Sequence, residues 1–292
     1  MHKSSIKEYQ ISATGIESTF QIKRMEDIYD NNNGQTDEPH RHNYYTILWS
    51  KEAQGVHRID FKEYTLKDHH VFFISPGQVH QLITTARPIG WGITFSKDFL
   101  IQNNIQTSFI SDINLFGSYG DSPPLALSME IEAKLATITT DILSYLEDSQ
   151  QTFKYEAVGA LLKLFLINCH SACAVNSQTL QQQTHVGIEL LRRFRALVDL
   201  HYQKEHKVSF YAKQLAISSD YLNKNIKTLT GKSAKEFIQT KITTEAKRLL
   251  IFTTISTKEL AYTLGFEEPS NFSNFFKNCT GQSPSAFKKQ HS

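Results

Sequence analysis

The chain has 292 residues, of which 40% are hydrophobic and 21% charged, a composition typical of a globular protein with room for two domains. Residues 1–15 hold no apolar run flanked by basic residues, which argues against a secretory signal, and the most apolar window, 160–168, is shorter than the ~20 residues that span a bilayer. Three cysteines without a paired framework favour a reducing, cytoplasmic location, and the apolar helical pattern around Cys169 and Cys173 favours buried packing over a metal or redox pair.

The front of the chain has the pattern of a β domain. Residues 19–85 contain short runs rich in β-branched and aromatic residues, separated by turn signals such as Asn33-Gly34 and Pro76-Gly77. Their spacing of about 8–12 residues predicts an antiparallel sandwich or small barrel. The runs are TFQIKR, YYTILWS, GVHRID, YTL, VFFIS and QLITT.

Helical patterns follow the predicted sheet. Apolar residues recur at three- and four-residue intervals over 128–149 and 155–175, which predicts two amphipathic helices. The polar segment 176–184 is then expected to be a linker. The predicted fold class is therefore α+β, with a β domain and two following helices at 1–175 and an all-α domain at 185–292.

Charge divides the chain at the same place. Residues 184–292 hold 17 Lys and Arg against 9 Asp and Glu, a balance of +8, whereas the other residues hold 14 against 20, a balance of −6. Such asymmetry is expected when one domain meets a polyanion and the other does not.

The C-terminal domain contains a repeated unit. Ala212 and Leu215 match Ala261 and Leu264 at an offset of 49, and the later matches have an offset of 50. These later pairs are Leu222 with Phe272, Ile226 with Phe276, Lys227 with Lys277, Thr230-Gly231 with Thr280-Gly281, and Phe237 with Phe287. Each unit is a short helix, a turn and a second helix, which is the helix-turn-helix outline. A helix at 233–250 joins the units, and Ser256 with Glu259 predicts a capping box at the start of the second.

The second helix of each unit is predicted to have an apolar face and a polar face. Leu222, Ile226 and Leu229, and in the second unit Phe272, Phe275 and Phe276, can turn towards a core. The opposite faces carry side chains able to bind base edges and phosphates in a major groove of double-stranded DNA. These candidates are Ser219, Asp220, Asn223, Lys224, Lys227, Ser270, Asn271, Ser273, Asn274 and Lys277.

The stretch KELAYTLGFEEPSNFSNFFKNCTGQSPSAFKK resembles the signature of the AraC/XylS family of bacterial transcription regulators. It shares Ala261-x-x-Leu264-Gly265-Phe266, the Phe-x-x-x-Phe-Lys of the following helix, Thr-Gly and Ser-Pro. The upstream unit fits as well, so the resemblance covers about 186–289. One departure is Phe287-Lys288, where the family often has Tyr-Arg.

This resemblance implies a seven-helix domain whose two recognition helices enter successive major grooves. The 18-residue connector is about 27 Å long, and groove entries lie ~34 Å apart, so the spacing is feasible once the turns are added. By carry-over, Asn223, Lys224, Asn271, Ser273 and Asn274 are expected to contact bases, and Lys227 and Lys277 to contact phosphates. The resemblance further implies RNA polymerase as a partner, activation more than repression, a small-molecule effector, and a homodimer formed through the helices at 128–149 and 155–175.

The front half, EPHRHNYY to PGQVHQL, resembles the cupin-like sensor domain that many AraC-type regulators carry. His40, His42 and His80 match the outline of the metal-binding cupin pattern, but its Glu position falls on Thr46 or Ile47, so no metal or other cofactor is expected. The three histidines are instead expected to form hydrogen bonds or to contact a ligand, although three imidazoles alone could hold zinc. Tyr45, Ile47 and Trp49 alternate on one predicted strand and are expected to point into the same cavity.

Three classes of function are compatible with these features. The first is a one-component, non-enzymatic transcription regulator with a ligand-responsive front domain. The second is a cupin-type metal-binding enzyme or metal sensor with an appended DNA-binding domain, which the missing Glu disfavours. The third is an architectural DNA-binding protein, which would show weak preference for sequence.

Overall fold

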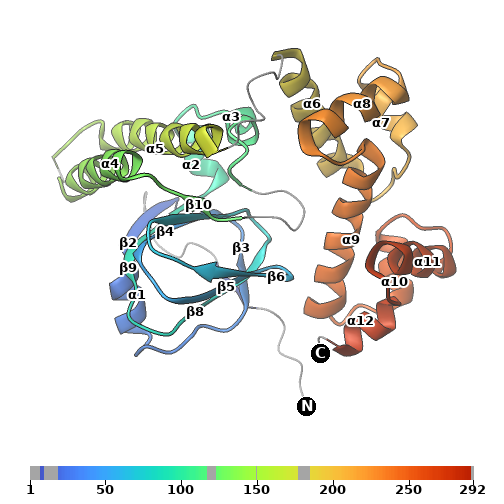
Figure 1. Cartoon of the computed structure of the whole chain (residues 1–292), viewed down its shortest axis with the longest axis horizontal. Coiled ribbons are helices and arrows are strands. Elements are labelled where there is room, and N and C mark those ends of the chain that lie inside the picture. Colours follow the sequence, from blue (N-terminus) through green and yellow to red (C-terminus); the bar gives the residue numbers. More distant parts are fainter. Residues whose placement is uncertain (1–6, 10–18, 117–122, 149, 177–184, 291–292) are drawn as a thin grey trace. The chain divides into compact units, whose positions relative to one another are not determined.

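The computed structural model describes residues 7–9, 19–116, 123–148, 150–176 and 185–290, shown in Figure 1. By their contacts, the described residues divide into two compact units, one within 6–180 and one within 181–292. The linker predicted at 176–184 lies outside the described residues, apart from Asn176.

The first unit is built on two five-stranded sheets, which confirms the predicted β domain. Sheet A has the strand order β1-β3-β8-β5-β6, and sheet B has the order β10-β7-β4-β9-β2. Successive side chains of a strand point to opposite faces of the sheet, so the two sets of alternate residues in each strand have different surroundings. The strands are β1 (Lys7–Tyr9), β2 (Phe20–Arg24), β3 (His40–His42), β4 (Tyr45–Glu52), β5 (Gly55–Ile59), β6 (Lys62–Leu66), β7 (His70–Ile74), β8 (Val79–Thr84), β9 (Ile89–Phe95) and β10 (Leu125–Ala126).

Two long helices follow the sheets, close to the predicted ranges. They are α4 (Met129–Glu147) and α5 (Lys154–Asn176), and Figure 1 shows them side by side against the β domain. Three shorter helices were not predicted, because one or two turns give too few residues for a helical period to be recognised. These are α1 (Met25–Asn31), α2 (Lys97–Gln102) and α3 (Thr107–Asp112).

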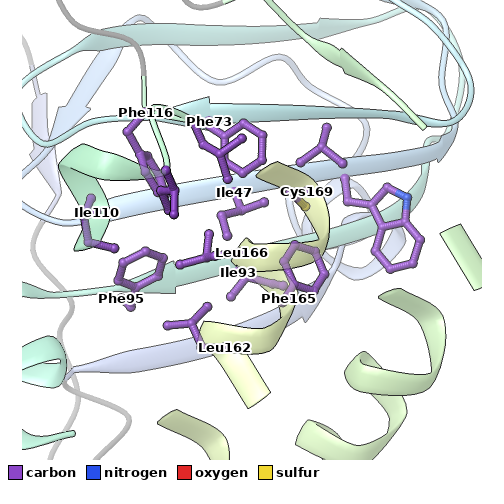
Figure 2. Close-up of a cluster of buried hydrophobic side chains, with 14 of the residues drawn as sticks. Ile47, Phe73, Ile93, Phe95, Ile110, Phe116, Leu162, Phe165, Leu166 and Cys169 are labelled. Carbon is purple, nitrogen blue, oxygen red and sulfur yellow. The ribbon is translucent and has the colours of Figure 1, made fainter. Parts of the chain in front are cut away.

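The main core of this unit lies between sheet B and α5. Ile47, Phe73 and Ile93 project from the sheet and pack against Phe165 and Leu166 of the helix, as Figure 2 shows. All five side chains are buried, and contacts of this kind across a sheet–helix interface fix α5 on sheet B. Cys169 is buried in the same cluster, which confirms the packing role predicted for it.

Part of α5, Lys154–Cys173, is long and apolar enough to cross a membrane by length and composition alone. This segment extends beyond residues 160–168, the most apolar window of the sequence. Val158, Leu162 and Leu166 on one of its faces are fully buried against the β domain. The central helix of a globular core passes the same test, so this finding is weak evidence for a span.

The second unit is all-helical, as predicted, with seven helices in residues 185–290. Gly231 and Gly281 end the second helix of each repeat in the left-handed conformation, with φ of 74° and 81°. The Ser256–Glu259 capping box is present, and Ser233 with Glu236 forms another at the start of the connecting helix. The helices are α6 (His185–His201), α7 (Val208–Gln214), α8 (Ser219–Thr230), α9 (Ala234–Phe252), α10 (Thr257–Thr263), α11 (Pro269–Thr280) and α12 (Pro284–Gln290).

Candidate DNA-binding surface and ligand cavity

Helices α8 and α11 bury matching faces. Leu222 and Ile226 of α8, and Phe272 and Phe276 of α11, are fully buried at positions exactly 50 residues apart. Since residues four apart lie on one face of a helix, these pairs anchor each helix in the same orientation within its repeat. The opposite side of each helix therefore faces solvent, and the side chains exposed there occupy equivalent positions of the two repeats.

Most of the predicted DNA-binding residues lie on these solvent-facing sides. Seven are exposed: Asp220, Lys224, Lys227, Ser270, Asn271, Asn274 and Lys277. The other three, Ser219, Asn223 and Ser273, are half-buried. We call the exposed set, together with Tyr221, the recognition surface of this unit.

Two of the half-buried residues are engaged in bonds within the protein. The side-chain Oδ1 of Asn223 accepts a hydrogen bond from the backbone N–H of Ala234, the first residue of α9, at 3.1 Å. Ser273 donates from its hydroxyl to the Pro269 carbonyl one turn earlier, at 2.9 Å. Asn223 and Ser273 therefore contribute to the folding of the unit, a role the sequence reasoning did not foresee.

Tyr221 was missed by the sequence reasoning. Its side chain is 47% exposed on the first turn of α8, and it occupies the position equivalent to Asn271 in α11. The offset of 50 that relates the two helices pairs these residues directly. The repeat could therefore have identified Tyr221 as a member of the surface.

In the first unit, strand register gathers four histidines on one face of sheet A. His40 and His42 are two residues apart on β3, and His40 pairs with His80 on β8. His80 in turn pairs with Ile59 on β5, which puts His57, two residues earlier, on the same face. His57 was not predicted as a site residue, although its alternation with Ile59 would have indicated an inward side chain.

A cavity of about 380 Å³ lies between the two sheets, next to this histidine cluster. Sheet A contributes His40, His42 and His80 to its lining, sheet B contributes Thr46 and Leu48, and α1 covers part of it with Met25, Ile28 and Tyr29. The volume falls within the range of sites that hold small molecules. Further lining residues are Tyr9, Gln21, Lys23, Asn32, Gln35, Thr36, Asp37, Tyr44, Leu82, Thr84, Pro88, Gly92 and Thr94.

Tyr45, Ile47 and Trp49 do not face the cavity. Ile47 and Trp49 are buried on the other side of sheet B, where Trp49 lies edge-on to Phe165, and Tyr45 stacks on Phe95 in the same cluster. The prediction that these three residues point into the cavity is therefore wrong. The alternation was recognised, but both faces of β4 are buried, so the sequence does not show which face meets the helices and which the cavity.

The histidines form a hydrogen-bonded chain. His57 Nε2 lies 3.1 Å from His80 Nδ1, and His80 Nε2 lies 2.7 Å from His42 Nε2. Whichever way the protons are arranged, one ring N–H at an end of this chain has no partner among the described residues, because His42 Nδ1 and His57 Nδ1 are both buried without one. Buried unsatisfied groups of this kind often mark functional sites.

Burial keeps His42, His57 and His80 uncharged. Removal from water lowers the pKa of His42 and of His57 to about 3, with a smaller contribution from His40 in each case. Burial and the neighbouring histidines also hold the pKa of His80 well below its usual value. Burial raises the pKa of the nearby Tyr44 to about 12. At neutral pH His42 and His80 therefore present uncharged imidazoles to the cavity, and the lone pairs of such rings can accept hydrogen bonds or bind metals.

A basic unit with two matched helix-turn-helix motifs, carried on the same chain as a β domain with a cavity, defines a DNA-binding regulator with a sensor domain. Comparison with known proteins agrees with this class. Residues 211–290 match the family model of a helix-turn-helix domain, and residues 25–95 match that of an AraC-like ligand binding domain. The chain belongs to the AraC/XylS family: it is an AraC-type transcription regulator with a ligand-binding N-terminal domain.

Relatives are similar to the chain over most of its length. The HTH-type transcriptional activator RhaS of Pectobacterium carotovorum subsp. carotovorum (strain PC1) is 23% identical over 86% of this chain and 87% of its own. The HTH-type regulator YfiF of Bacillus subtilis (strain 168) is 22% identical over 85% of this chain and 78% of its own. Among solved structures, ToxT from Vibrio cholerae covers 94% of this chain and 99% of its own, at 16% identity and a TM-score of 0.43.

Proposed function

We propose that the protein is a sequence-specific transcription activator that changes its action at promoters when a small ligand occupies the cavity. The observation that carries this proposal is the pair of recognition helices, α8 and α11, which expose matched polar faces within a unit of net charge +8. Activation is inferred from relatives named as activators, of which RhaS is one. No catalytic step is part of this function.

Within the recognition surface, we assign different roles to different side chains. Lys224 and Asn274 occupy equivalent exposed positions and are proposed to contact base edges, as is Asn271. Lys227 and Lys277 lie one turn later and are proposed to contact phosphates, which fix the position of the protein without reading sequence. The connecting helix α9 has 19 residues and is about 28 Å long, which suits two helices placed in successive grooves ~34 Å apart.

The proposed partners beyond DNA are RNA polymerase and a second copy of the chain. Dimerisation is supported by the outer face of α5, where Leu164 and Ile167 are 46% and 42% exposed. We propose a sensor and dimerisation domain at 1–175, a linker at 176–184 and a DNA-binding domain at 185–292, acting in the cytoplasm.

The test is whether the full-length protein prefers particular DNA sites. Genomic fragments bound by the purified chain would be selected and sequenced, and the affinity for the recovered site compared with that for a shuffled duplex at one salt concentration. A regulator of this kind is expected to prefer its site by ~10³-fold or more. A folded protein with less than tenfold preference would instead be an architectural DNA-binding protein.

A further inference from the structure

We propose that His40, His42 and His80 bind one divalent transition-metal ion of the zinc class, and that this ion is the ligand to which the regulator responds. The proposal rests on the proposed function, because it assumes that the cavity is the sensing site. It identifies the class of ligand from the donor atoms that the fold brings together.

The geometry places three nitrogen donors around one point. One ring nitrogen of each histidine lies within 4.8 Å of those of the other two, and all three side chains are buried. Two imidazoles at Zn–N distances near 2.0–2.1 Å in a tetrahedral site hold their nitrogens roughly 3.3 Å apart, which is longer than the 2.7 Å between His42 Nε2 and His80 Nε2 and shorter than the 4.8 Å within which all three donors lie. Binding of an ion would therefore move the His42 and His80 rings apart and replace the hydrogen bond between them.

The surroundings of two of these rings resemble those of metal ligands. His40 Nδ1 donates to the Glu38 carbonyl at 2.8 Å and also lies 3.4 Å from the Asp37 carboxylate. In the neutral ring this leaves the lone pair on Nε2, which has no hydrogen-bond partner among the described residues. His80 Nδ1 can donate to His57 Nε2, which leaves the lone pair of His80 on its Nε2. That lone pair then accepts the 2.7 Å hydrogen bond from His42 Nε2, a bond that a metal ion would replace. Partners on the second nitrogen are a regular feature of metal-bound histidine.

A purely structural hydrogen-bonded cluster would explain less of this arrangement. The chain from His57 through His80 to His42 needs no fourth ring, yet His40 lies with its ring centroid 4.5 Å from that of His80. Its position is explained if its Nε2 is a third donor.

The donor set also indicates which ions would bind. Imidazole nitrogens suit Zn²⁺, Cu²⁺ and Ni²⁺, whereas Mg²⁺ and Ca²⁺ require oxygen ligands. Three protein ligands leave at least one coordination position for water or an anion on the cavity side. The Asp37 carboxylate, hydrogen-bonded by Tyr9 at 3.1 Å, would offset part of the ion's charge.

The experiment uses the full-length protein, stripped of metal with a chelator and then dialysed. Zn²⁺ binding is measured by calorimetry against a competing chelator, and Co²⁺ binding by its visible absorption bands. The variants are H40Q, H42Q and H80Q, with H69Q as the matched control, since His69 is an exposed histidine of the same unit that pairs with Glu132 outside the cavity. DNA affinity for the selected site is measured on the same samples, with and without Zn²⁺.

We expect one ion per wild-type and H69Q chain, cobalt bands of a site with nitrogen ligands, and a loss of more than ~100-fold in affinity in each ligand variant, beyond the 10–100-fold typical of second-shell changes. Zn²⁺ should alter the DNA affinity of wild type and leave that of H42Q unchanged. If H42Q and H80Q do not fold, H40Q still tests the proposal, because His40 lies outside the His57–His80–His42 hydrogen-bonded chain.

Two results would overturn the proposal: wild-type protein without a stoichiometric ion at micromolar Zn²⁺, or a bound ion without effect on DNA affinity. In both cases a retained preference for the selected site would leave the proposed function intact. Bound metal with no preference for any DNA site would instead refute the proposed function.

Discussion

The Oδ1 atom of Asn223 accepts the backbone N–H of Ala234 at 3.1 Å, and so ties the first recognition helix to the start of α9. In the second repeat the equivalent positions are Ser273 and Pro284, and proline has no N–H to satisfy. The first N–H groups of a helix have no partner within the helix. An acceptor at position 223 therefore has a structural purpose that position 273 lacks.

The first prediction is that Asn223→Ala destabilises the DNA-binding unit by about 1 kcal/mol, because it leaves a buried N–H unpaired. Ala234→Pro removes that donor at a position where proline is favoured, and its preceding residue, Ser233, is already extended, with ψ of 159°. In the Ala234→Pro background, Asn223→Ala is then expected to cost close to nothing.

Urea unfolding of the four proteins, followed by far-ultraviolet circular dichroism, gives the coupling energy of this double-mutant cycle. Ser273→Ala serves as the control and should cost less than Asn223→Ala. Equal costs of Asn223→Ala in both backgrounds would show that Asn223 stabilises the unit through another contact.

The second prediction separates side chains that read sequence from those that bind phosphate. Lys224→Ala and Asn274→Ala are expected to lower the affinity for the selected site more than that for a shuffled duplex. Lys277→Ala should weaken binding to both about equally and reduce the salt slope by about one unit. The exposed Lys97, in the first unit, provides a matched control that should change neither. Titrations at several salt concentrations test this, and equal losses on both duplexes for all three variants would contradict the assignment.

The architecture of the DNA-binding unit could be predicted closely because its signals are local and occur twice. Apolar spacing, the Thr-Gly caps and the capping box each depend on residues a few positions apart, and the repeat confirms each reading independently. The partner of Asn223 lies in another helix, so helical periodicity places the residue on the polar face but does not show its bond to Ala234.

The cavity was harder to predict because its walls depend on strand register. The three histidines predicted as a group do meet, since β3 and β8 are neighbours in sheet A. Strand β4 is buried on both faces, so alternation alone did not show that Thr46 lines the cavity and Ile47 faces α5. His57 entered the cluster through pairing of β5 with β8, a contact between segments that carry no shared sequence signal.

The third prediction concerns Tyr221. Its exposed ring lies on the recognition surface, so Tyr221→Ala should weaken DNA binding while changing the free energy of unfolding by less than about 0.5 kcal/mol. Tyr221→Phe retains the ring and removes the hydroxyl, and the comparison therefore separates a hydrogen bond to DNA from packing against it. Tyr262, which is exposed on α10, is the matched control. Unchanged DNA affinity of Tyr221→Ala would remove this residue from the surface.

The fourth prediction uses the turns of the two repeats, which have different residues at the left-handed position. Ala216 has φ of 56°, and the equivalent Gly265 has φ of 78°. Alanine in the left-handed region is strained by about 1–2 kcal/mol, so Ala216→Gly should stabilise the protein by roughly 0.5–1 kcal/mol after the greater chain entropy of glycine is subtracted.

Gly265→Ala should have the opposite and larger effect. A Cβ there would lie 2.1 Å from the Gln203 carbonyl oxygen, and backbone would have to move to admit it. Denaturation midpoints of both variants test the pair, and a destabilising Ala216→Gly would mean that the turn of the first repeat carries no strain.

The fifth prediction is that the β domain loses stability as the pH falls from about 6.5 towards 3. In the fold, burial lowers the pKa of His42 and of His57 to about 3, whereas an unfolded histidine has a pKa near 6.5. Between those values the unfolded chain binds protons that the folded chain does not. Each such group therefore lowers the free energy of unfolding by up to about 1.4 kcal/mol per pH unit of acidification, and its contribution is fully retained only above pH 6.5.

His57→Asn removes one of these groups and should reduce the slope of stability against pH between 5 and 6 by about 1 kcal/mol per pH unit. The slope is the quantity to compare, because loss of the bond to His80 lowers stability at every pH. Urea unfolding in the presence of a chelator, followed through the fluorescence of Trp49 and Trp91, reports on this unit, since both tryptophans of the chain lie in it. If His57→Asn keeps the wild-type slope, burial does not lower the pKa of His57 below that of the unfolded chain, and the uncharged state described above for His57 is wrong.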